Sequence, residues 1–328
     1  KYLMPVDVSG AGGASLRRVE ASHEIGGDAL REVFGTIRDW LRERRRFAAA
    51  TLIGVRDAAP APLGTTLAVD DGLRIAGSIG AGCHEGAIVE AALQAALDGR
   101  ARLYDVDLTE EDGVAPVACG ASLRVALWVP DHAFAQIADR IARGDESVRC
   151  ALPDTEFALE VAARAPLLIV GATALAARVA ALARHADFHT TLVDPRPAFA
   201  TTERVPEADV IVREWPDVCL PHLLDASSAI VVLSHDRKFD VPALRSALRS
   251  GARYIGYLGS RRSQAAMQTV LRSEGFGDAD LARIHGPVGL DLGGRAEPEI
   301  AVAIVAELIA ARHGAPGWSL SEARALHA

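Results

Sequence analysis

Short apolar segments alternate with helical patterns through the second half of the chain, from about residue 165 onward. The expected strands lie at 167–170, 190–193, 210–212, 230–233 and 254–258, and the expected helices at 174–185, 241–249 and 263–273. Strands that alternate with helices of about 10–15 residues indicate βαβ units, which build a parallel sheet covered on both faces. We therefore predict an α/β protein whose C-terminal domain, residues 166–328, is a Rossmann-like doubly wound parallel sheet.

The first half has a different order of elements. Strands are expected at 48–55, 65–69, 73–76, 103–106 and 123–129, and helices after Asp28, at 87–97 and at 133–143. This order predicts an N-terminal α+β domain over residues 27–150. Residues 1–26 are rich in glycine and serine without periodicity, which predicts a mobile leader. The charged segment 151–165, which contains Pro153, is the expected linker between the domains.

Composition limits the classes of function. With 328 residues, half of them hydrophobic, the chain can fill two ordinary cores. A net charge of −8 argues against a nucleic-acid-binding surface. The most apolar helical pattern, 300–311, contains Glu307 and is shorter than the ~20 residues of a membrane span. The four cysteines lack zinc or iron–sulfur spacing, and no secretory leader is visible, so we expect a cytoplasmic protein.

A glycine-dense loop, GSIGAGCHEG at residues 77–86, precedes the helix expected at 87–97. Glycines such as Gly82 let a ligand approach the backbone closely. The start of a helix attracts anions and lowers the pKa of a nearby thiol, which makes Cys83 a predicted reactive thiol. Glu85 adds a carboxylate to the same loop. Ordinary turn chemistry is the alternative interpretation.

The first turn of the predicted Rossmann domain departs from the dinucleotide-binding pattern. That pattern is G-x-G-x-x-G/A, and Thr173 stands where the second glycine would let the backbone reach a pyrophosphate. The Cβ of Thr173 would crowd the phosphates, so NAD is an unexpected ligand. Asp194, at the end of the next strand, is either a ribose-binding acid or a polar strand end beside Pro195.

A second helix start favours phosphate. Ser260 can cap the helix expected at 263–273, and Arg261 and Arg262 bring two guanidinium groups to its N-terminus. Arginine forks, backbone N–H groups and the helix dipole all favour an anion there. A solvated arginine pair is the alternative.

Further polar residues follow the strands of the predicted sheet. His235 and Asp236 come after the strand at 230–233, at the edge where doubly wound sheets bind ligands. They are candidate acid and base groups, or they form a loop hydrogen bond. Asp291 adds a carboxylate from a tight loop that sheet topology places near the same edge. Glu307 is either a satisfied core acid or faces a partner.

Five sequence blocks resemble the xanthine dehydrogenase accessory protein family (XdhC/CoxI), in family order over about residues 30–313. They are residues 77–86, where Gly77, Ser78, Gly82, Cys83, Glu85 and Gly86 match, then Cys119-Gly120, Ser234-His235-Asp236 with Asp240, the block from Tyr254 to Arg262, and residues 287–293. Departures are Gly80-Ala81 and His84 in the first block, and Thr173 where the family usually has glycine.

The resemblance implies an accessory protein for a molybdenum hydroxylase such as xanthine dehydrogenase or aerobic carbon monoxide dehydrogenase. It implies molybdenum cofactor (molybdopterin) bound as cargo, support for its sulfuration and insertion into the client enzyme, and a sulfurase of the cysteine-desulfurase type as a partner. A homodimer is compatible with this role. Cys83, with Cys119, would contact the metal or sulfur centre, and residues Ser260 to Arg262 would hold the phosphate. Gly82, Glu85, His235, Asp236 and Asp291 complete the candidate binding residues.

Two enzymatic classes are the alternatives to an accessory protein. A nucleotide-dependent oxidoreductase could use the Rossmann half, with Thr173 as the feature against it. A catalytic xanthine dehydrogenase subunit would need iron–sulfur cysteines or a much longer molybdenum domain, and neither is in the sequence. The sequence therefore favours a maturation factor over a catalyst.

Overall fold

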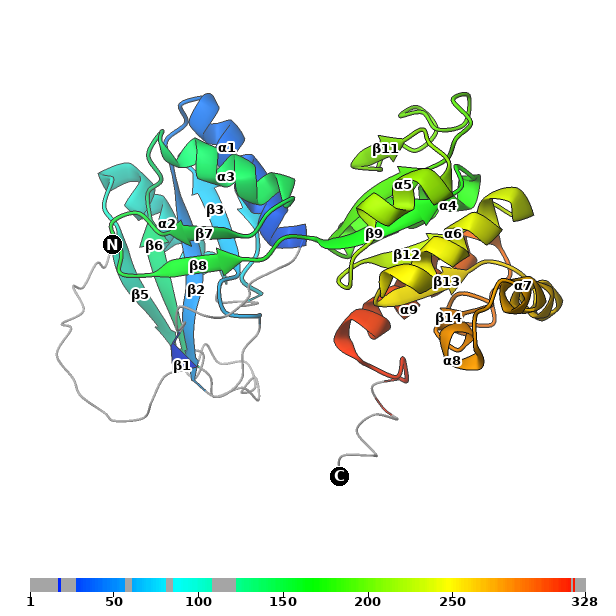
Figure 1. Cartoon of the computed structure of the whole chain (residues 1–328). Coiled ribbons are helices and arrows are strands. Elements are labelled where there is room, and N and C mark those ends of the chain that lie inside the picture. The colour runs from blue at the N-terminus through cyan, green and yellow to red at the C-terminus, as the bar shows by residue number, and fades with distance from the viewer. Residues whose placement is uncertain are drawn as a thin grey trace. The chain divides into compact units, whose positions relative to one another are not determined.

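A computed structural model describes residues 17–18, 28–56, 61–80, 85–107, 122–319 and 321. The chain divides into two compact units, an N-terminal unit, Lys1–Ala163, and a C-terminal unit, Arg164–Ala328 (Figure 1). Each unit has its own sheet and its own hydrophobic core. No helix within the described ranges is both long enough and apolar enough to cross a membrane.

The N-terminal unit is built on an antiparallel sheet with the strand order β4-β3-β2-β6-β5. The strands are β2 (Phe47–Arg56), β3 (Thr66–Asp70), β4 (Ile75–Gly77), β5 (Arg102–Asp107) and β6 (Ser122–Trp128). Successive side chains of a strand face opposite sides of a sheet, so Ala49 and Ile53 join one core while Ala50 and Leu52 join the other. The first core holds α1 (Asp28–Arg42) and α3 (Phe134–Arg143), and the second holds α2 (Glu85–Asp98).

The expected linker is instead part of the N-terminal unit. Residues 151–165 contain β8 (Ala158–Val161), which pairs antiparallel with β7 (Val148–Ala151). Alternate residues of this hairpin are buried in the core beneath α1 and α3, because each strand turns one face inward. The boundary between the two units falls between residues 163 and 164 of the chain. Of the predicted leader, only Arg17 and Arg18 are described. They form β1, which pairs with β2.

The C-terminal unit has a parallel six-stranded sheet with the order β11-β10-β9-β12-β13-β14, which confirms the predicted doubly wound fold. Its strands are β9 (Ala165–Val170), β10 (Phe188–Val193), β11 (Val210–Val212), β12 (Ala229–Val232), β13 (Tyr254–Tyr257) and β14 (Ile284–His285). In chain order this is the 3-2-1-4-5-6 arrangement of dinucleotide-binding folds. The order reverses between β9 and β12, so ligands are expected outside the carboxyl ends of the central strands.

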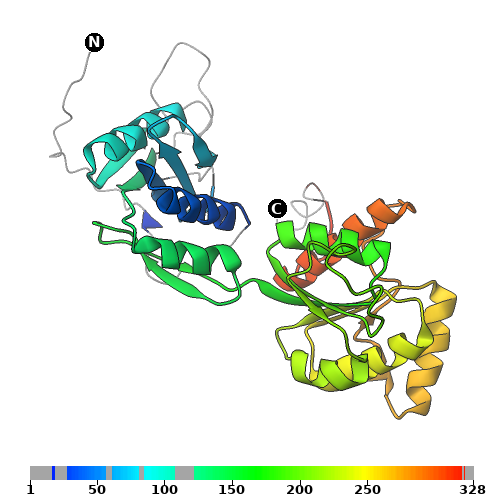
Figure 2. The same cartoon turned by 90° about the horizontal axis from the view of Figure 1, so that it is seen from above.

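Helices cover both faces of this sheet (Figure 2). One core packs α4 (Ala174–His185) and α9 (Glu297–His313) against it, and the opposite core packs α5 (Pro216–Leu223), α6 (Arg237–Ser250) and α7 (Arg261–Ser273). The short α8 (Asp278–Leu281) contributes Leu281 to the second core.

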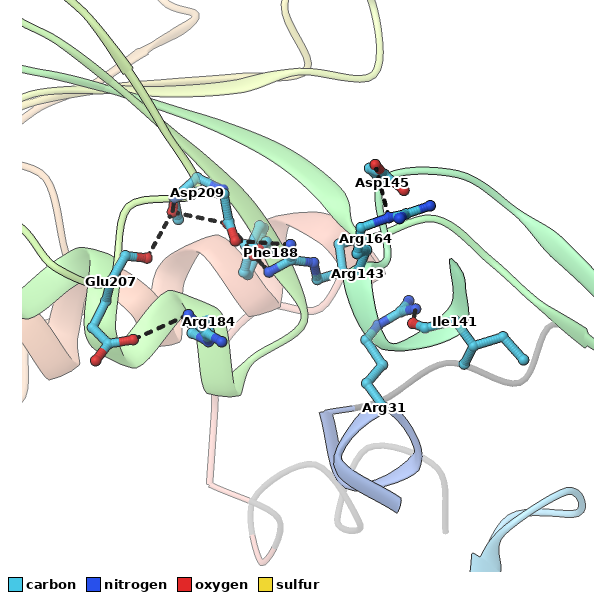
Figure 3. A network of polar contacts seen from close by, with 10 residues as sticks. Arg31, Ile141, Arg143, Asp145, Arg164, Arg184, Phe188, Glu207 and Asp209 are labelled. Atoms are coloured by element: carbon cyan, nitrogen blue, oxygen red, sulfur yellow. Dashed lines mark hydrogen bonds and ion pairs between the residues drawn. The ribbon is translucent and has the colours of Figure 1, made fainter. Parts of the chain in front are cut away.

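Arg164 fixes the start of β9 (Figure 3). Its Nη1 and Nη2 donate to Asp209 Oδ2 and Oδ1 at 3.2 and 2.9 Å, and Nη1 also donates to the carbonyl oxygen of Phe188. Burial opposes ionisation of Asp209, but hydrogen bonds from Thr190 and Arg164 outweigh it and hold the pKa of the carboxyl below its usual value. In the N-terminal unit, Arg31 donates to the carbonyl oxygen of Ile141 at 3.0 Å. These buried guanidinium groups satisfy backbone oxygens and so fix strand and helix ends.

Candidate functional site

Two loops meet closely at the point where the strand order reverses. Gly171 follows β9 with φ +101°, a backbone conformation that side-chain-bearing residues rarely adopt. A Cβ at this position would lie 2.5 Å from the Cα and 2.8 Å from the N of Ser234, which follows β12. The glycine is therefore required for the two loops to pack together.

The turn after β9 has already used most of the N–H groups that a pyrophosphate would need. Gly171 donates to Val193 O at 2.9 Å, and Thr173 N donates to Gly171 O at 3.0 Å. The Thr173 side chain caps α4, with its Oγ1 accepting from Ala176 N at 3.1 Å. The Thr173 hydroxyl thus occupies the position in which a bound phosphate would accept the hydrogen bond from Ala176 N.

Asp194 is hydrogen-bonded to other groups of the protein. It is fully buried, and its Oδ2 accepts from Ala172 N at 2.7 Å and from Arg196 Nη2 at 2.6 Å. Its Oδ1 accepts from Arg196 Nε at 2.9 Å. Burial opposes ionisation, but these hydrogen bonds outweigh it and hold the pKa of Asp194 below its usual value. Both oxygens are occupied, which favours a structural role over ribose binding.

A pocket of about 310 Å³ lies at the carboxyl ends of β12 and β13, and we refer to it as the β12–β13 pocket. Its lining includes His235, Arg237, Asp240, Tyr257, Arg262 and Ser263. The structure thus brings two of the sequence-predicted residues, His235 and Arg262, into one pocket. Arg261 is exposed in the first turn of α7 and does not line it.

His235 and Asp236 are adjacent in the sequence but have different surroundings. His235 is exposed to the pocket with φ +57°, a strained conformation for a residue with a Cβ. Asp236 is the N-cap of α6, accepting from Lys238 N at 3.1 Å and pairing with Lys238 Nζ at 3.2 Å. The structure therefore makes His235 the pocket residue of this pair and gives Asp236 a capping role.

The N-terminus of α7 forms a basic wall of the β12–β13 pocket. Ser260 caps the helix as expected, accepting from Ser263 N at 3.1 Å. Within the described residues, neither Arg262 nor Arg237 forms an ion pair, and the backbone N–H groups of Arg261 and Arg262 find no acceptor. Arg262 and the first N–H groups of α7, together with Arg237 at the start of α6, have no partner among the described residues and suit an anion.

Sequence reasoning did not assign a role to Asp240, which is only 2% exposed. Asp240 belongs to the third of the matching sequence blocks, and its place on the apolar face of α6, one turn before the buried Ala243 and Leu244, was a second signal. Its Oδ1 accepts from Ser234 Oγ at 2.5 Å. Burial raises the pKa of Asp240 to about 6, against the opposing effect of the Ser234 hydrogen bond.

Replacing Asp240 by asparagine should change the pH dependence of stability. The carboxyl pKa is 3.8 when exposed and about 6 in the fold, so the folded state keeps a proton that the unfolded state loses. Wild-type stability therefore falls by up to about 3 kcal/mol as the pH rises from about 4 to above 6. Urea unfolding should show that Asp240→Asn gains stability relative to wild type over this interval. A pH-independent difference between the two proteins would contradict the buried titration.

Two further acids lie outside the β12–β13 pocket. Asp291 is exposed, with its Oδ1 accepting from Gly293 N at 3.2 Å, and it does not line the pocket. Glu307 on α9 accepts from Tyr254 Oη at 2.8 Å, His285 Nδ1 at 2.9 Å and Gly289 N at 2.6 Å. Burial opposes its ionisation, but these contacts hold its pKa below the usual value. Glu307 is thus a satisfied core acid.

The glycine loop of the N-terminal unit is described only at its ends. Gly77 has φ +76°, and a Cβ there would lie 2.6 Å from Thr66 O. Glu85 accepts from Ser78 Oγ at 3.0 Å and from Ile79 N at 3.1 Å, so it closes the loop at the start of α2. The predicted contact residues Gly82, Cys83 and Cys119 lie outside the described residues.

The other two cysteines do not form a site. Burial raises the pKa of Cys150 to about 12, and mainly burial raises that of Cys219 to about 11, so both thiols stay protonated at neutral pH. Among the described residues, no group of three or more histidine, cysteine or acidic side chains could hold a metal ion.

Each of the two units matches the model of a known protein family. The XdhC Rossmann domain matches residues 167–308, and the XdhC and CoxI family matches residues 40–107. A crystal structure of a Bacillus halodurans protein described as a xanthine dehydrogenase has a TM-score of 0.71 and 21% identity, covering 88% of this chain and 96% of that one. At this identity the likeness concerns the fold alone.

Three curated proteins are similar to this chain in sequence. YqeB of Escherichia coli K12 is 24% identical over 83% of this chain and 44% of its own length. A probable xanthine dehydrogenase subunit of Bacillus subtilis 168 is 30% identical over 44% of this chain and 42% of its own. The molybdenum cofactor insertion chaperone PaoD of Escherichia coli K12 is 24% identical over 80% and 82%. The chain thus spans less than half the length of the first two relatives. With both units matched in order, the chain belongs to the XdhC and CoxI family.

Proposed function

We propose that this chain is a maturation factor that binds the molybdenum cofactor and supports its insertion into a molybdenum hydroxylase of the xanthine dehydrogenase or carbon monoxide dehydrogenase type. Family membership and the described roles of PaoD and of the Bacillus subtilis relative support this proposal. The main support is the β12–β13 pocket, whose arginines have no ion-pair partner in the described part of the chain and whose open helix start suits a phosphate.

The residues of the β12–β13 pocket fit the phosphate end of molybdopterin. Arg262 and Arg237 would hold the phosphate together with the first N–H groups of α7. A volume of about 310 Å³ is at the small end of the ~300–1,000 Å³ range of ligand pockets, enough for the phosphate and part of the attached ring system. His235 would contribute a further donor beside the phosphate.

The residues proposed to contact the metal end of the cofactor come from the sequence. Molybdenum and its dithiolene sulfurs favour thiolate partners, so Cys83 and Cys119 would contact this end, with Gly82 and Glu85 shaping the loop. Three further parts of the proposal rest on the family resemblance. They are sulfuration of the bound cofactor, docking of a sulfurase of the cysteine-desulfurase type, and formation of a homodimer.

The cofactor content of freshly purified protein tests this proposal. The chain is expressed in a host that makes molybdopterin and purified without oxygen, and released small molecules are identified by mass spectrometry. We expect molybdopterin or its oxidation products in near-stoichiometric amount, and less in the Arg237→Ala/Arg262→Ala protein. Absence of any pterin from the wild-type protein would contradict the proposal.

The alternative, a nucleotide-dependent oxidoreductase, is suggested by the strand order of the C-terminal sheet. The hydrogen bonds of Gly171, Ala172 and Thr173 argue against it, because these N–H groups are already paired. We expect NADH to bind weakly or not at all in calorimetric titration, and Thr173→Gly to improve residual binding by removing the Cβ and freeing Ala176 N. Micromolar binding of NADH to the wild-type protein would instead support the oxidoreductase.

A further inference from the structure

Asp240 is an acidic group in a pocket whose other charged residues are basic. It lines the β12–β13 pocket with His235, Arg237 and Arg262. Within the described part of the chain, it forms no ion pair with either arginine, although both side chains are exposed. Neutralising these arginines is therefore not the role of this carboxyl.

The two oxygens of the Asp240 carboxyl have different surroundings. Oδ1 accepts from Ser234 Oγ at 2.5 Å, and Ser234 is itself held in place against Gly171. Oδ2 accepts no hydrogen bond from any described residue, and it is not among the fully enclosed polar atoms that lack a partner. One oxygen is thus fixed by the protein, and the other is left open to the pocket.

A buried carboxylate with an unused oxygen costs free energy unless a donor reaches it. With a pKa of about 6, the Asp240 carboxyl is mostly ionised at neutral pH. The rest of the lining includes Tyr257, Leu258 and Ala266, which offer apolar contact surface to a ring. The pocket therefore combines an anion-binding wall, an apolar wall and one acceptor.

We propose that Asp240 is a ligand-binding residue that accepts a hydrogen bond from the organic part of a phosphate monoester whose phosphate lies at Arg237 and Arg262. This inference rests on the proposed function of the same pocket and names the class of ligand it selects. The ligand is a phosphate ester whose ring or side chain carries N–H or O–H donors. Inorganic phosphate and pyrophosphate lack this organic part, so they bring anionic charge near Asp240 without a ring or side-chain donor for its free oxygen.

Calorimetry of the full chain at neutral pH with two probes tests the inference. The probes are inorganic phosphate and guanosine 5′-monophosphate, whose ring carries amide and amine N–H donors. Asp240→Asn should bind inorganic phosphate at least as tightly as wild type, because a like charge is removed. The same variant should bind guanosine 5′-monophosphate ~10–100-fold more weakly, because a charge-assisted hydrogen bond is lost.

The opposite directions of the two effects separate ligand recognition from damage to the fold. Asp217→Asn, which removes an acid from the first turn of α5 outside the pocket, is the matched control and should leave the ratio of the two affinities unchanged. Equal weakening of both probes by Asp240→Asn, unchanged nucleotide affinity, or no binding of either probe to wild type would overturn the inference. A wild-type protein that shows the expected ratio yet carries no molybdopterin would contradict only the proposed cargo.

Discussion

The Gly171→Ala substitution is expected to destabilise the C-terminal sheet. The glycine has φ +101°, and the new Cβ would lie 2.5 Å from the Cα of Ser234, a backbone atom that cannot move without shifting the loop after β12. Backbone strain and overpacking together should cost about 3 kcal/mol or more. Hydrogen exchange of the β9 and β12 amides measures this loss as a lower free energy of opening.

Gly275→Ala separates the clash from the strain. Gly275 also has a positive φ, +94°, but a Cβ there would have no atom of a described residue within 4 Å. Its loss of stability should be only about 1 kcal/mol, the cost of strained backbone alone. If Gly171→Ala were no more destabilising than Gly275→Ala, close packing of the two loops would not hold the site together.

Removing both arginines of the β12–β13 pocket should weaken binding of molybdopterin by ~10–1,000-fold. Arg237 and Arg262 approach the pocket from two different helices, and within the described residues no carboxylate pairs with either. Each would make a charge-assisted hydrogen bond to the phosphate, so the two losses should be cumulative. Fluorescence titration with molybdopterin at fixed ionic strength measures the effect, since salt screens these contacts.

Arg261→Ala is the matched control for this loss. Arg261 precedes Arg262 in the first turn of α7 and is also exposed, but it does not line the pocket. Its removal should change affinity by no more than about twofold, the scale of a solvent-exposed charge that makes no direct contact. Equal losses from Arg261→Ala and Arg262→Ala would indicate general attraction by positive charge rather than a built phosphate site.

The sequence predicted the C-terminal fold well because its signals are local. The helix expected at 174–185 has the bounds of α4, and the strand expected at 210–212 has those of β11, since apolar periodicity and flanking turns are short-range features. The β7–β8 hairpin was missed because its strands are four residues long and half of their side chains face solvent. Such segments are difficult to distinguish from a charged linker.

The candidate site could be predicted only in part. His235 and Arg262 follow strands at the carboxyl edge, and that position is visible in the sequence. The role of Asp240 depends on its contact with Ser234 six residues earlier and on the pocket beside it, which only the folded chain defines. The hydrogen bonds from Arg196 to Asp194 likewise favour one of the two roles that the sequence left open, and they too are visible only in the folded chain.

The most direct test of the account is the activity of a molybdenum hydroxylase client in a host that lacks this gene. We expect the client to accumulate as folded protein with little bound sulfurated cofactor and little activity. The wild-type gene and Arg261→Ala should restore activity, whereas the Arg237→Ala/Arg262→Ala gene should not. Full client activity without the gene, or full restoration by the double variant, would contradict a role in cofactor delivery through the β12–β13 pocket.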